Sequence, residues 1–278
     1  MVMGPTHAMS GAAAWLAAAA LGGGALAAAM GESPAVIALG TAVCAGAALA
    51  PDIDSHSSTV VRSFGIFGKL AHHVADGLSV AVYAATSSRY DKPRENGHRT
   101  LFHTTAMAIL VAVLVSLGSS LPGEVTIAGK VFALGQLFSL VIMGLFLHLG
   151  LAGIFEKQVK SARKKYGPYL LMAASAGLTA LTAMALPENE KYSWLGLAVG
   201  IGWFMHLLGD MITKMGVPMA WPVKIRGKRW YDVTLPSFMR ISADGTGNTV
   251  LLFLCTCVSI LMILLLIPAT NGFITGLF

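Results

Sequence analysis

The sequence predicts an all-α protein: a polytopic integral membrane bundle of about seven transmembrane helices, plus one interfacial or re-entrant helix near residues 67–86. The first observation is composition, because 55% of the 278 residues are hydrophobic, 12% are charged and the mean hydropathy is +0.71. Soluble domains carry about 25% charged residues. The second is a series of apolar windows of about 20 residues, enough to cross a hydrocarbon core roughly 30 Å thick. The third is that no segment alternates like a barrel strand.

Long apolar windows define the expected spans. They cover residues 8–30, 34–50, 101–121, 131–154, 168–186, 194–213 and 249–268. The first window resembles a signal peptide in part, but no Lys or Arg precedes it and a second apolar run follows at once, so we expect a retained helix. Its many Ala and Gly residues suit close helix packing in a membrane.

Basic residues gather in particular loops and set the expected orientation. Lys and Arg are frequent in the loops that follow the second, fourth and sixth windows and in the loop before residue 101, whereas "GESP", "LPGEVTIAGK" and "LPENEKYS" have few. The positive-inside rule therefore places the basic loops and the amino terminus in the cytoplasm. The net charge of +6 needs no nucleic-acid partner, since the basic residues are dispersed. Membrane lipids are the expected partners.

Residues 67–86 decide whether this topology is consistent. The segment is apolar in its second half but carries Lys69, His72, His73 and Asp76 in its first. If it spans, the basic loops on its two sides face opposite compartments. If it lies at the interface or re-enters, every basic loop is cytoplasmic, and we favour this arrangement. Residues 1–278 then form a single integral membrane domain, with 214–248 as a cytoplasmic loop.

Ionisable residues stand at the ends of several expected spans, where they are costly and by default indicate function. They are His7, Asp52, Asp54, His98, His103, His206 and Asp210. His206 and Asp210 are four residues apart and share a helix face. Asp52 and Asp54 flank one residue after Pro51, which ends the preceding helix. In the expected topology all seven lie toward the cytoplasmic end.

This set of side chains predicts a metal site. A single histidine at a helix end is more often a hydrogen-bonded interfacial residue, and an aspartate after proline is usually a turn residue. Together, imidazoles and carboxylates are the ligands of zinc and similar divalent ions, which would compensate the buried negative charge. The candidates are too many for one tetrahedral ion. We expect two or three ions, zinc first and manganese as the alternative, with Asp52 or Asp54 as a bridge.

Four motifs, "THAMSG", "ALAPDID", "HRTLFHT" and "MHLLGDMITKMGVPMAWP", resemble in order and spacing those of the YdjM-like family. The resemblance covers most of the chain. It implies a bacterial inner-membrane protein and a metal-dependent hydrolase, and it carries an association with LexA that no residue of this sequence indicates by itself. The family also resembles, distantly, the zinc-dependent phospholipase C and P1 nuclease enzymes, whose helices hold a multi-zinc site.

The chain departs from the family pattern at several positions. Thr100 and Phe102 replace a glycine and a threonine between the two histidines, and Lys214 replaces the proline usual after the H-x-x-x-D threonine. The segment "RISADGTGNTV" lacks the glutamate that relatives often carry near a T-G pair. The candidate ligands are kept, whereas the loop geometry and a general-base role for that glutamate are not supported.

The expected chemistry is metal-assisted hydrolysis of a phosphoester. Asp54 and Arg99 are the candidate catalytic residues, since Asp54 can bridge ions and the Arg99 guanidinium fork suits phosphoryl oxygens. Contact with lipid head groups is the alternative role of Arg99. A site at the membrane interface predicts a lipid or amphiphilic phosphate as substrate. The other function classes are a non-catalytic regulator with a structural metal site and a transporter, which would place polar groups at mid-membrane.

Further polar residues allow two interpretations. His72 and Asp76 share a helix face and either add ligands to the cluster or belong to an interfacial amphipathic helix. His148 stands alone in an apolar window, which predicts a hydrogen bond to a neighbouring helix. Cys44, Cys255 and Cys257 have no metal-site spacing and are expected to be structural thiols.

Overall fold

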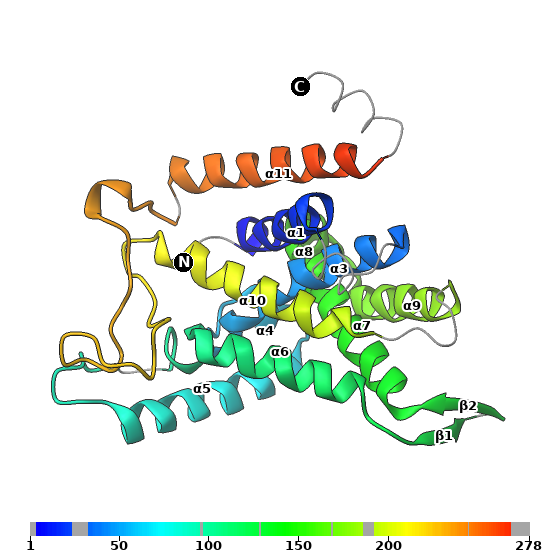
Figure 1. The fold of residues 1–278 in the computed structure, drawn as a ribbon, viewed down its shortest axis with the longest axis horizontal. Helices are drawn as coiled ribbons and strands as arrows, with labels where there is room; N and C mark the ends of the chain where they lie inside the picture. The colour runs from blue at the N-terminus through cyan, green and yellow to red at the C-terminus, as the bar shows by residue number, and fades with distance from the viewer. Residues whose placement is uncertain are drawn as a thin grey trace.

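The structure, a computed structural model, describes residues 4–23, 33–94, 97–127, 129–167, 169–185, 192–243 and 245–267. The α-helices of these segments are α1 (Gly4–Leu21), α3 (Pro34–Ala47), α4 (Thr59–Ser63), α5 (Ile66–Thr86), α6 (Thr105–Ser119), α7 (Leu134–Ile154), α8 (Glu156–Tyr166), α9 (Tyr169–Ala185), α10 (Trp194–Met211) and α11 (Thr246–Leu266). Three short 3-10 helices are η1 (Ala50–Asp54), η2 (Leu101–His103) and η3 (Ser237–Met239). The all-α prediction is confirmed (Figure 1).

Four helical segments of the described chain are long and apolar enough to cross a membrane: Pro34–Asp54, Leu134–Ile154, Trp194–Met211 and Thr246–Leu266. Helix α6 is apolar but shorter, and α8 with α9 form a bent pair. Helix α5 has the length of a span, but the polar residues of its first half keep it out of this group. The full number of spans and the interfacial position of α5 therefore stay predictions.

A short hairpin corrects the expected helix boundaries. Residues 131–133 do not belong to the helix expected over 131–154, because β2 (Lys130–Ala133) pairs antiparallel with β1 (Glu124–Ile127). The hairpin turns at Gly129, whose φ of 79° suits glycine. Val125 pairs with Phe132, and Thr126 with Val131, so β-branched and aromatic side chains stand opposite one another. The helix begins only at Leu134, and α6 likewise begins at Thr105 and not at residue 101.

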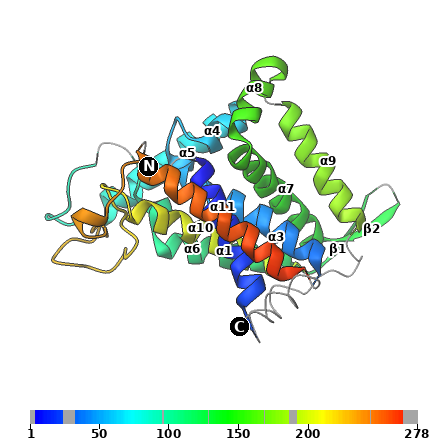
Figure 2. The same ribbon diagram turned by 90° about the horizontal axis from the view of Figure 1, so that it is seen from above.

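The core of the bundle lies where α1, α3, α7 and α10 meet. Ala8, Trp15, Val43, Leu147 and Leu195 are all buried there. Small residues let these helices approach, since a Cβ at Gly46 would clash with the backbone of α7 and a Cβ at Gly202 with that of α3. Helix α11 packs against α1 on the outside, as Figures 1 and 2 both show.

The predicted hydrogen bond of His148 is confirmed. From α7, its Nε2 lies 3.3 Å from the carbonyl oxygen of Ser63 in α4, and its Nδ1 lies 3.3 Å from the hydroxyl of Ser175 in α9. The ring of Phe64 covers His148, with ring centroids 4.4 Å apart. His148 therefore joins three helices, and none of its contacts with the residues that the structure describes suggests a ligand role.

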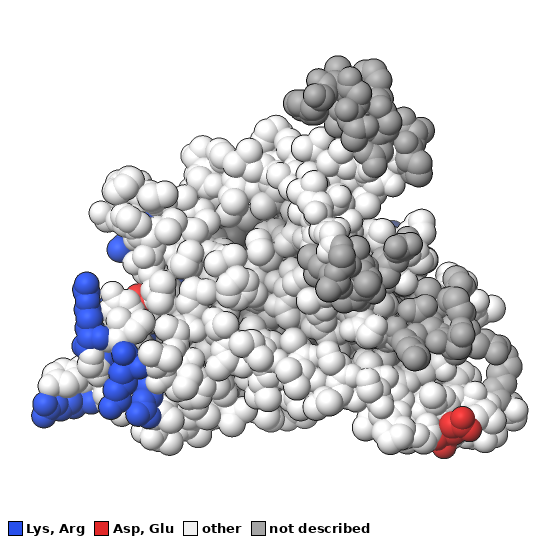
Figure 3. Space-filling view, in the orientation of Figure 1, with Lys and Arg blue, Asp and Glu red and all other residues white. Residues whose placement is uncertain are grey.

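One end of the bundle gathers the loops that carry polar residues. The segment between α10 and α11 and the segment between α5 and α6 lie at the same end in both ribbon views (Figures 1 and 2). Trp230 and Arg229 donate backbone N–H groups to the Asp91 carboxylate, which ties the two segments together. On the face seen in Figure 3, Lys and Arg gather at this end, and the acidic side chains stand mainly near the hairpin at the other.

Candidate metal centre

Four segments that are distant in sequence bring all seven predicted residues to this end of the bundle. The first turn of α1 carries His7, η1 carries Asp52 and Asp54, the segment that ends in η2 carries His98 and His103, and the last turns of α10 carry His206 and Asp210. Six of them are buried and His98 is partly exposed. The convergence expected from their positions at helix ends is therefore present in the structure.

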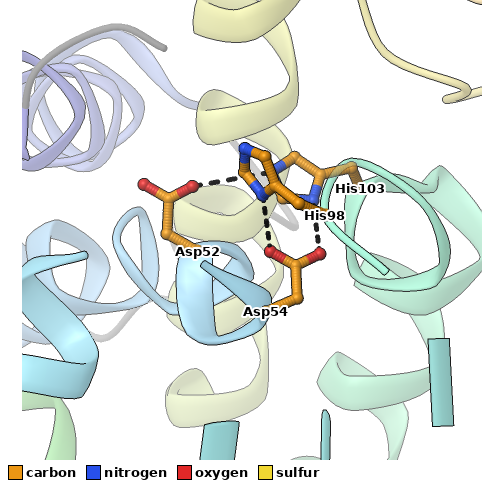
Figure 4. Close-up of side chains that lie close together, drawn as sticks. All are labelled: Asp52, Asp54, His98 and His103. Atoms are coloured by element: carbon orange, nitrogen blue, oxygen red, sulfur yellow. Dashed lines mark hydrogen bonds and ion pairs between the residues drawn. The ribbon is translucent and has the colours of Figure 1, made fainter. Parts of the chain in front are cut away.

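One half of the cluster is organised by Asp54 (Figure 4). Its Oδ1 accepts a hydrogen bond from His98 Nδ1 at 2.9 Å, and its Oδ2 lies 3.3 Å from His103 Nδ1. On the far side of the His103 ring, Nε2 lies 3.7 Å from Asp52 Oδ1. Asp52, Asp54, His98 and His103 each offer one ligand atom, and these atoms lie within 4.8 Å of one another. The group has the composition of a divalent metal site.

The other half joins α1 to α10. The rings of His7 and His206 stack with centroids 3.9 Å apart and an interplanar angle of 18°. His7 Nε2 lies 3.5 Å from Asp210 Oδ1. His206 Nδ1 donates to the carbonyl oxygen of Ala48 at 2.8 Å. Because a carbonyl oxygen can only accept, the Nε2 of a neutral His206 keeps its lone pair for the cluster.

His103 connects the two halves. Its Nε2 lies 3.2 Å from His206 Nε2 and 3.7 Å from Asp210 Oδ2. The same nitrogen faces Asp52 from the first half. The seven residues therefore form one continuous cluster, which is large enough for more than one ion.

Local backbone features explain how the two loop segments present their side chains. Pro51 follows the end of α3, and the chain makes the 3-10 turn η1, in which both Asp52 and Asp54 are buried. Thr104 caps α6, because its side chain accepts the backbone N–H of Met107 at 3.1 Å, so His103 comes just before the helix. Trp203 of α10 donates from Nε1 to the carbonyl oxygen of Phe102 at 2.8 Å and holds η2 in place.

Arg99 is inside the cluster and does not face lipid. The residue is 2% exposed, and its Nη2 forms an ion pair with Asp210 Oδ2 at 2.8 Å. Its Nη1 donates to Thr213 Oγ1 at 3.1 Å and to the carbonyl oxygen of Gly216 at 2.9 Å. The backbone of Arg99 has a φ of 57°, which is uncommon for a residue other than glycine and costs roughly 1–2 kcal/mol. The contacts of Nη1 with Thr213 and Gly216 hold the guanidinium in its ion pair with Asp210.

His72 and Asp76 do not join either group of ligands; each holds the backbone beside one. His72 Nδ1 donates to the carbonyl oxygen of Ile53 at 2.9 Å, between the two aspartates of η1. Asp76 Oδ1 accepts the backbone N–H of Gly97 at 2.9 Å, next to His98. Their spacing of four residues on α5 was the available signal, but the sequence did not show that they bind backbone. Helix α5 therefore positions both ligand segments.

Several polar atoms of the cluster are buried without a hydrogen bond. In the part of the chain that the structure describes, these include Asp52 Oδ1, Asp54 Oδ2, His103 Nδ1 and both ring nitrogens of His7. The cluster contains three carboxylates, of which only Asp210 is paired with a guanidinium, so two negative charges are uncompensated when the histidines are neutral. Buried charge and unpaired polar atoms are costly, and divalent cations would satisfy both. The residues present therefore fit a metal centre.

Two side chains mark where the cluster is open. The side chains of His7, His103, His206 and Asp210 are 0% exposed, whereas that of His98 is 21% exposed and that of Asp52 is 10% exposed. Any small molecule that reaches the cluster would approach between η1 and the loop before η2. The ligands carried by α1 and α10 are closed off from the surface.

The sequence matches the model of the YdjM inner membrane protein family over residues 1–152 and 170–271. The chain belongs to this family. The family description agrees with the apolar helices of the structure, which fit membrane insertion. Comparison with curated proteins and with solved structures gives no match. Membership is thus shown for nearly the whole chain, while the distant similarity to zinc-dependent phospholipase C and P1 nuclease stays a prediction.

Proposed function

We propose that this YdjM-family protein is a membrane-bound, metal-dependent hydrolase that acts on a phosphoester of a lipid or amphiphilic substrate. The observation that carries the proposal is the buried cluster of four histidines and three aspartates with unsatisfied ligand atoms. Perturbed, charged groups buried at the end of a bundle are typical of functional sites and are expensive as mere structure.

The geometry supports two ions, one in each half of the cluster. Asp52, Asp54, His98 and His103 would hold one, and His7, His206 and Asp210 the other, with zinc favoured and manganese as the alternative. Such ions would supply Lewis-acid chemistry, by activating water and by neutralising charge on a phosphoryl group. The separation of the ligands into two groups argues for a paired site.

The protein's own residues would orient this chemistry. Asp54 accepts from His98 and faces His103, so it can fix how both rings are presented. Arg99 holds Asp210 and adds positive charge where a phosphoryl oxygen would be stabilised. The partial exposure of His98 and Asp52 provides the side from which a substrate would enter. The burial of His7, His103, His206 and Asp210 would keep bulk water away from that side of the cluster.

The basic end of the bundle supports a cytoplasmic position for the site. Lys and Arg gather at that end on the face shown in Figure 3, and the positive-inside rule places such an end in the cytoplasm. We therefore propose a multi-pass protein of the bacterial inner membrane, with the amino terminus in the cytoplasm. An amphiphilic substrate could then reach the site from the inner leaflet.

A non-catalytic regulator with a structural metal site is the second candidate. The complete burial of His103, His206 and Asp210 favours it, because structural metal sites are closed and catalytic ones keep an open position. A transporter is less well supported, since the cluster lies at one end of the helices and not near their middle.

Elemental analysis of the detergent-purified chain, with assays of phosphodiester and phospholipid hydrolysis on the same samples, tests the proposal. Asp52→Ala and His206→Ala should each lower the metal content and abolish hydrolysis. His56→Ala removes an exposed histidine outside the cluster and should change neither. Metal without turnover in the wild-type chain would favour the regulator. No metal after reconstitution with zinc or manganese would refute the metal site.

A further inference from the structure

A second polar site lies beside the metal centre. It is a cavity of about 240 Å³, and its lining includes Lys92, Lys214, Lys228, Tyr231, Thr234 and Arg240. We call it the basic pocket. Its walls come from the loop after α5 and from the segment between α10 and α11. None of these residues belongs to the cluster of candidate ligands.

The positive charge of the basic pocket is largely uncompensated. Its carboxylate, Asp232, is already paired with Arg94 at 2.6 Å. The Nε of Arg240 donates to the carbonyl oxygen of Leu235 at 2.6 Å. Among the residues that the structure describes, no carboxylate pairs with Lys92, Lys214 or Lys228. Cations that line one cavity repel each other, and a bound anion would relieve that repulsion.

Backbone pairing fixes the frame of the basic pocket. Val217 and Val233 exchange hydrogen bonds of 3.2 and 2.8 Å, which closes the loop after α10 on itself. The rings of Trp221 and Trp230 stack with centroids 5.1 Å apart. Asp91 accepts the backbone N–H of Trp230 at 2.9 Å and fixes the pocket to the loop after α5. A frame of this kind holds the lysines near one another without a ligand, which lowers the entropy lost on binding.

Two connections join the basic pocket to the metal centre. Lys214 directly follows Thr213, whose hydroxyl accepts a hydrogen bond from Arg99. Asp232 pairs with Arg94, and Arg94 also donates from Nη1 to the backbone carbonyl oxygen of Arg99 at 2.6 Å. Arg99 in turn forms the ion pair with Asp210. Arg94 and Arg99 do not line the pocket, but their contacts connect its lining to the cluster.

We propose that the basic pocket binds a phosphate group of an anionic ligand. Three ammonium groups supply charge, and the hydroxyl groups of Tyr231 and Thr234 are the neutral hydrogen-bonding groups of the lining. In a step that rests on the proposed function, this phosphate belongs to the head group of the substrate, and the pocket holds it next to the metal centre. The same chemistry could come from a lipid head group or from a soluble phosphate.

Binding, and not turnover, is the direct test. Titration calorimetry of the detergent-purified chain with inorganic phosphate, in the presence of a metal chelator, isolates the basic pocket from any metal. The pocket variant carries Lys92→Gln, Lys214→Gln and Lys228→Gln. The control variant carries Lys157→Gln, Lys164→Gln and Lys165→Gln on α8, which removes the same charge outside the pocket. An unchanged thermal unfolding temperature of both variants in detergent shows that they fold.

We expect saturable phosphate binding that weakens at least about tenfold in the pocket variant and little in the control, because charged contacts are lost only in the former. Binding should also weaken as ionic strength rises. Equal weakening in both variants would mean general attraction of anions by a basic surface and would overturn the proposal. Absence of saturable binding would overturn it as well.

A second measurement separates the two sources of phosphate. The chain is titrated with phosphatidylcholine vesicles that either contain or lack phosphatidylglycerol. If the wild-type chain prefers vesicles with phosphatidylglycerol and the pocket variant loses that preference, the ligand is a lipid head group. If the chain binds inorganic phosphate but shows no preference for these vesicles, the ligand is a soluble phosphate. Asp52→Ala keeps the basic pocket, so its phosphate binding should persist even if the hydrolase proposal fails.

Discussion

The Nε2 atoms of His103 and His206 lie 3.2 Å apart at the centre of the cluster. The hydrogen bond from His206 Nδ1 to the carbonyl oxygen of Ala48 directs the Nε2 of His206 toward this point. His103 and His206 belong to different groups of candidate ligands, so this short separation is where the two halves of the cluster meet.

His103→Ala should remove more metal than His98→Ala. His103 faces Asp54 on one side and Asp52, His206 and Asp210 on the other. Among the carboxylates that the structure describes, His98 contacts Asp54 alone. We expect His103→Ala to lose ions from both halves and His98→Ala to lose only one. Elemental analysis of both purified variants measures this. Equal metal content in the two variants would show that His103 does not connect the halves.

Asp76→Ala should weaken metal binding although Asp76 is not among the candidate ligands. Its carboxylate accepts the backbone N–H of Gly97, next to His98. Loss of a partner that orients a ligand costs about 10–100-fold in metal affinity. Competition with a chelator of known affinity gives the dissociation constant.

Two further variants interpret that result. Asp76→Asn keeps an oxygen acceptor and should restore most of the affinity. His73→Ala changes an exposed neighbour on the same helix and should have no effect. If Asp76→Asn is as weak as Asp76→Ala, the charge of Asp76 matters and not its hydrogen bond to Gly97.

The sequence predicted the cluster of candidate ligands better than its surroundings. His206 and Asp210 were linked by helical spacing, and the other ligands by their position at the ends of apolar windows. The contact of His103 with both halves depends on how η2 packs against α10, which spacing does not determine. The basic pocket likewise unites Lys92 with Lys228 across 136 positions of the sequence. Such pairs follow from tertiary structure and leave no local pattern.

The short hairpin and the role of α5 were missed for related reasons. Residues 124–130 lie between the apolar windows 101–121 and 131–154, and Val131, Phe132 and Ala133 begin the latter window without a break in hydropathy. His72 and Asp76 looked like ligands or interfacial residues because hydrogen bonds to backbone have no sequence signal. Neither the hairpin nor these hydrogen bonds change the predicted all-α class of the fold.

Arg99→Ala should destabilise the protein strongly in the absence of metal. It removes the cation from a buried ion pair and leaves Asp210 with only histidines beside it, a change that costs about 3–5 kcal/mol. Arg99→Lys keeps the charge, but its single ammonium group cannot pair with Asp210 and also reach Thr213 and Gly216. We therefore expect a loss of stability between those of the wild-type chain and Arg99→Ala. Thermal unfolding of chelator-treated samples in detergent measures both variants.

Arg94→Gln is the control for this series. Arg94 is partly exposed, and its ion pair with Asp232 lies outside the cluster. Its loss should cost less, because water can replace its contacts. A larger loss of thermal stability in Arg94→Gln than in Arg99→Ala would show that the contacts of Arg94 with the loops matter more than the pairing of Asp210.

The contact between the loops after α5 and after α10 should weaken in acid. Burial raises the pKa of Asp91, but hydrogen bonds, chiefly from the backbone N–H groups of Ser88 and Trp230, lower it more, so the folded pKa lies below the ordinary value of 3.8. A carboxyl group with a lowered folded pKa stabilises the fold above its unfolded pKa. That contribution is lost as the pH falls through 3.8 toward the folded pKa.

The fluorescence of Trp230 and limited proteolysis of residues 223–229 report the opening of this contact between the two loops. Asp91→Asn should open more readily at neutral pH and show little further change in acid, and an unaltered acid response in that variant would assign the effect to another group.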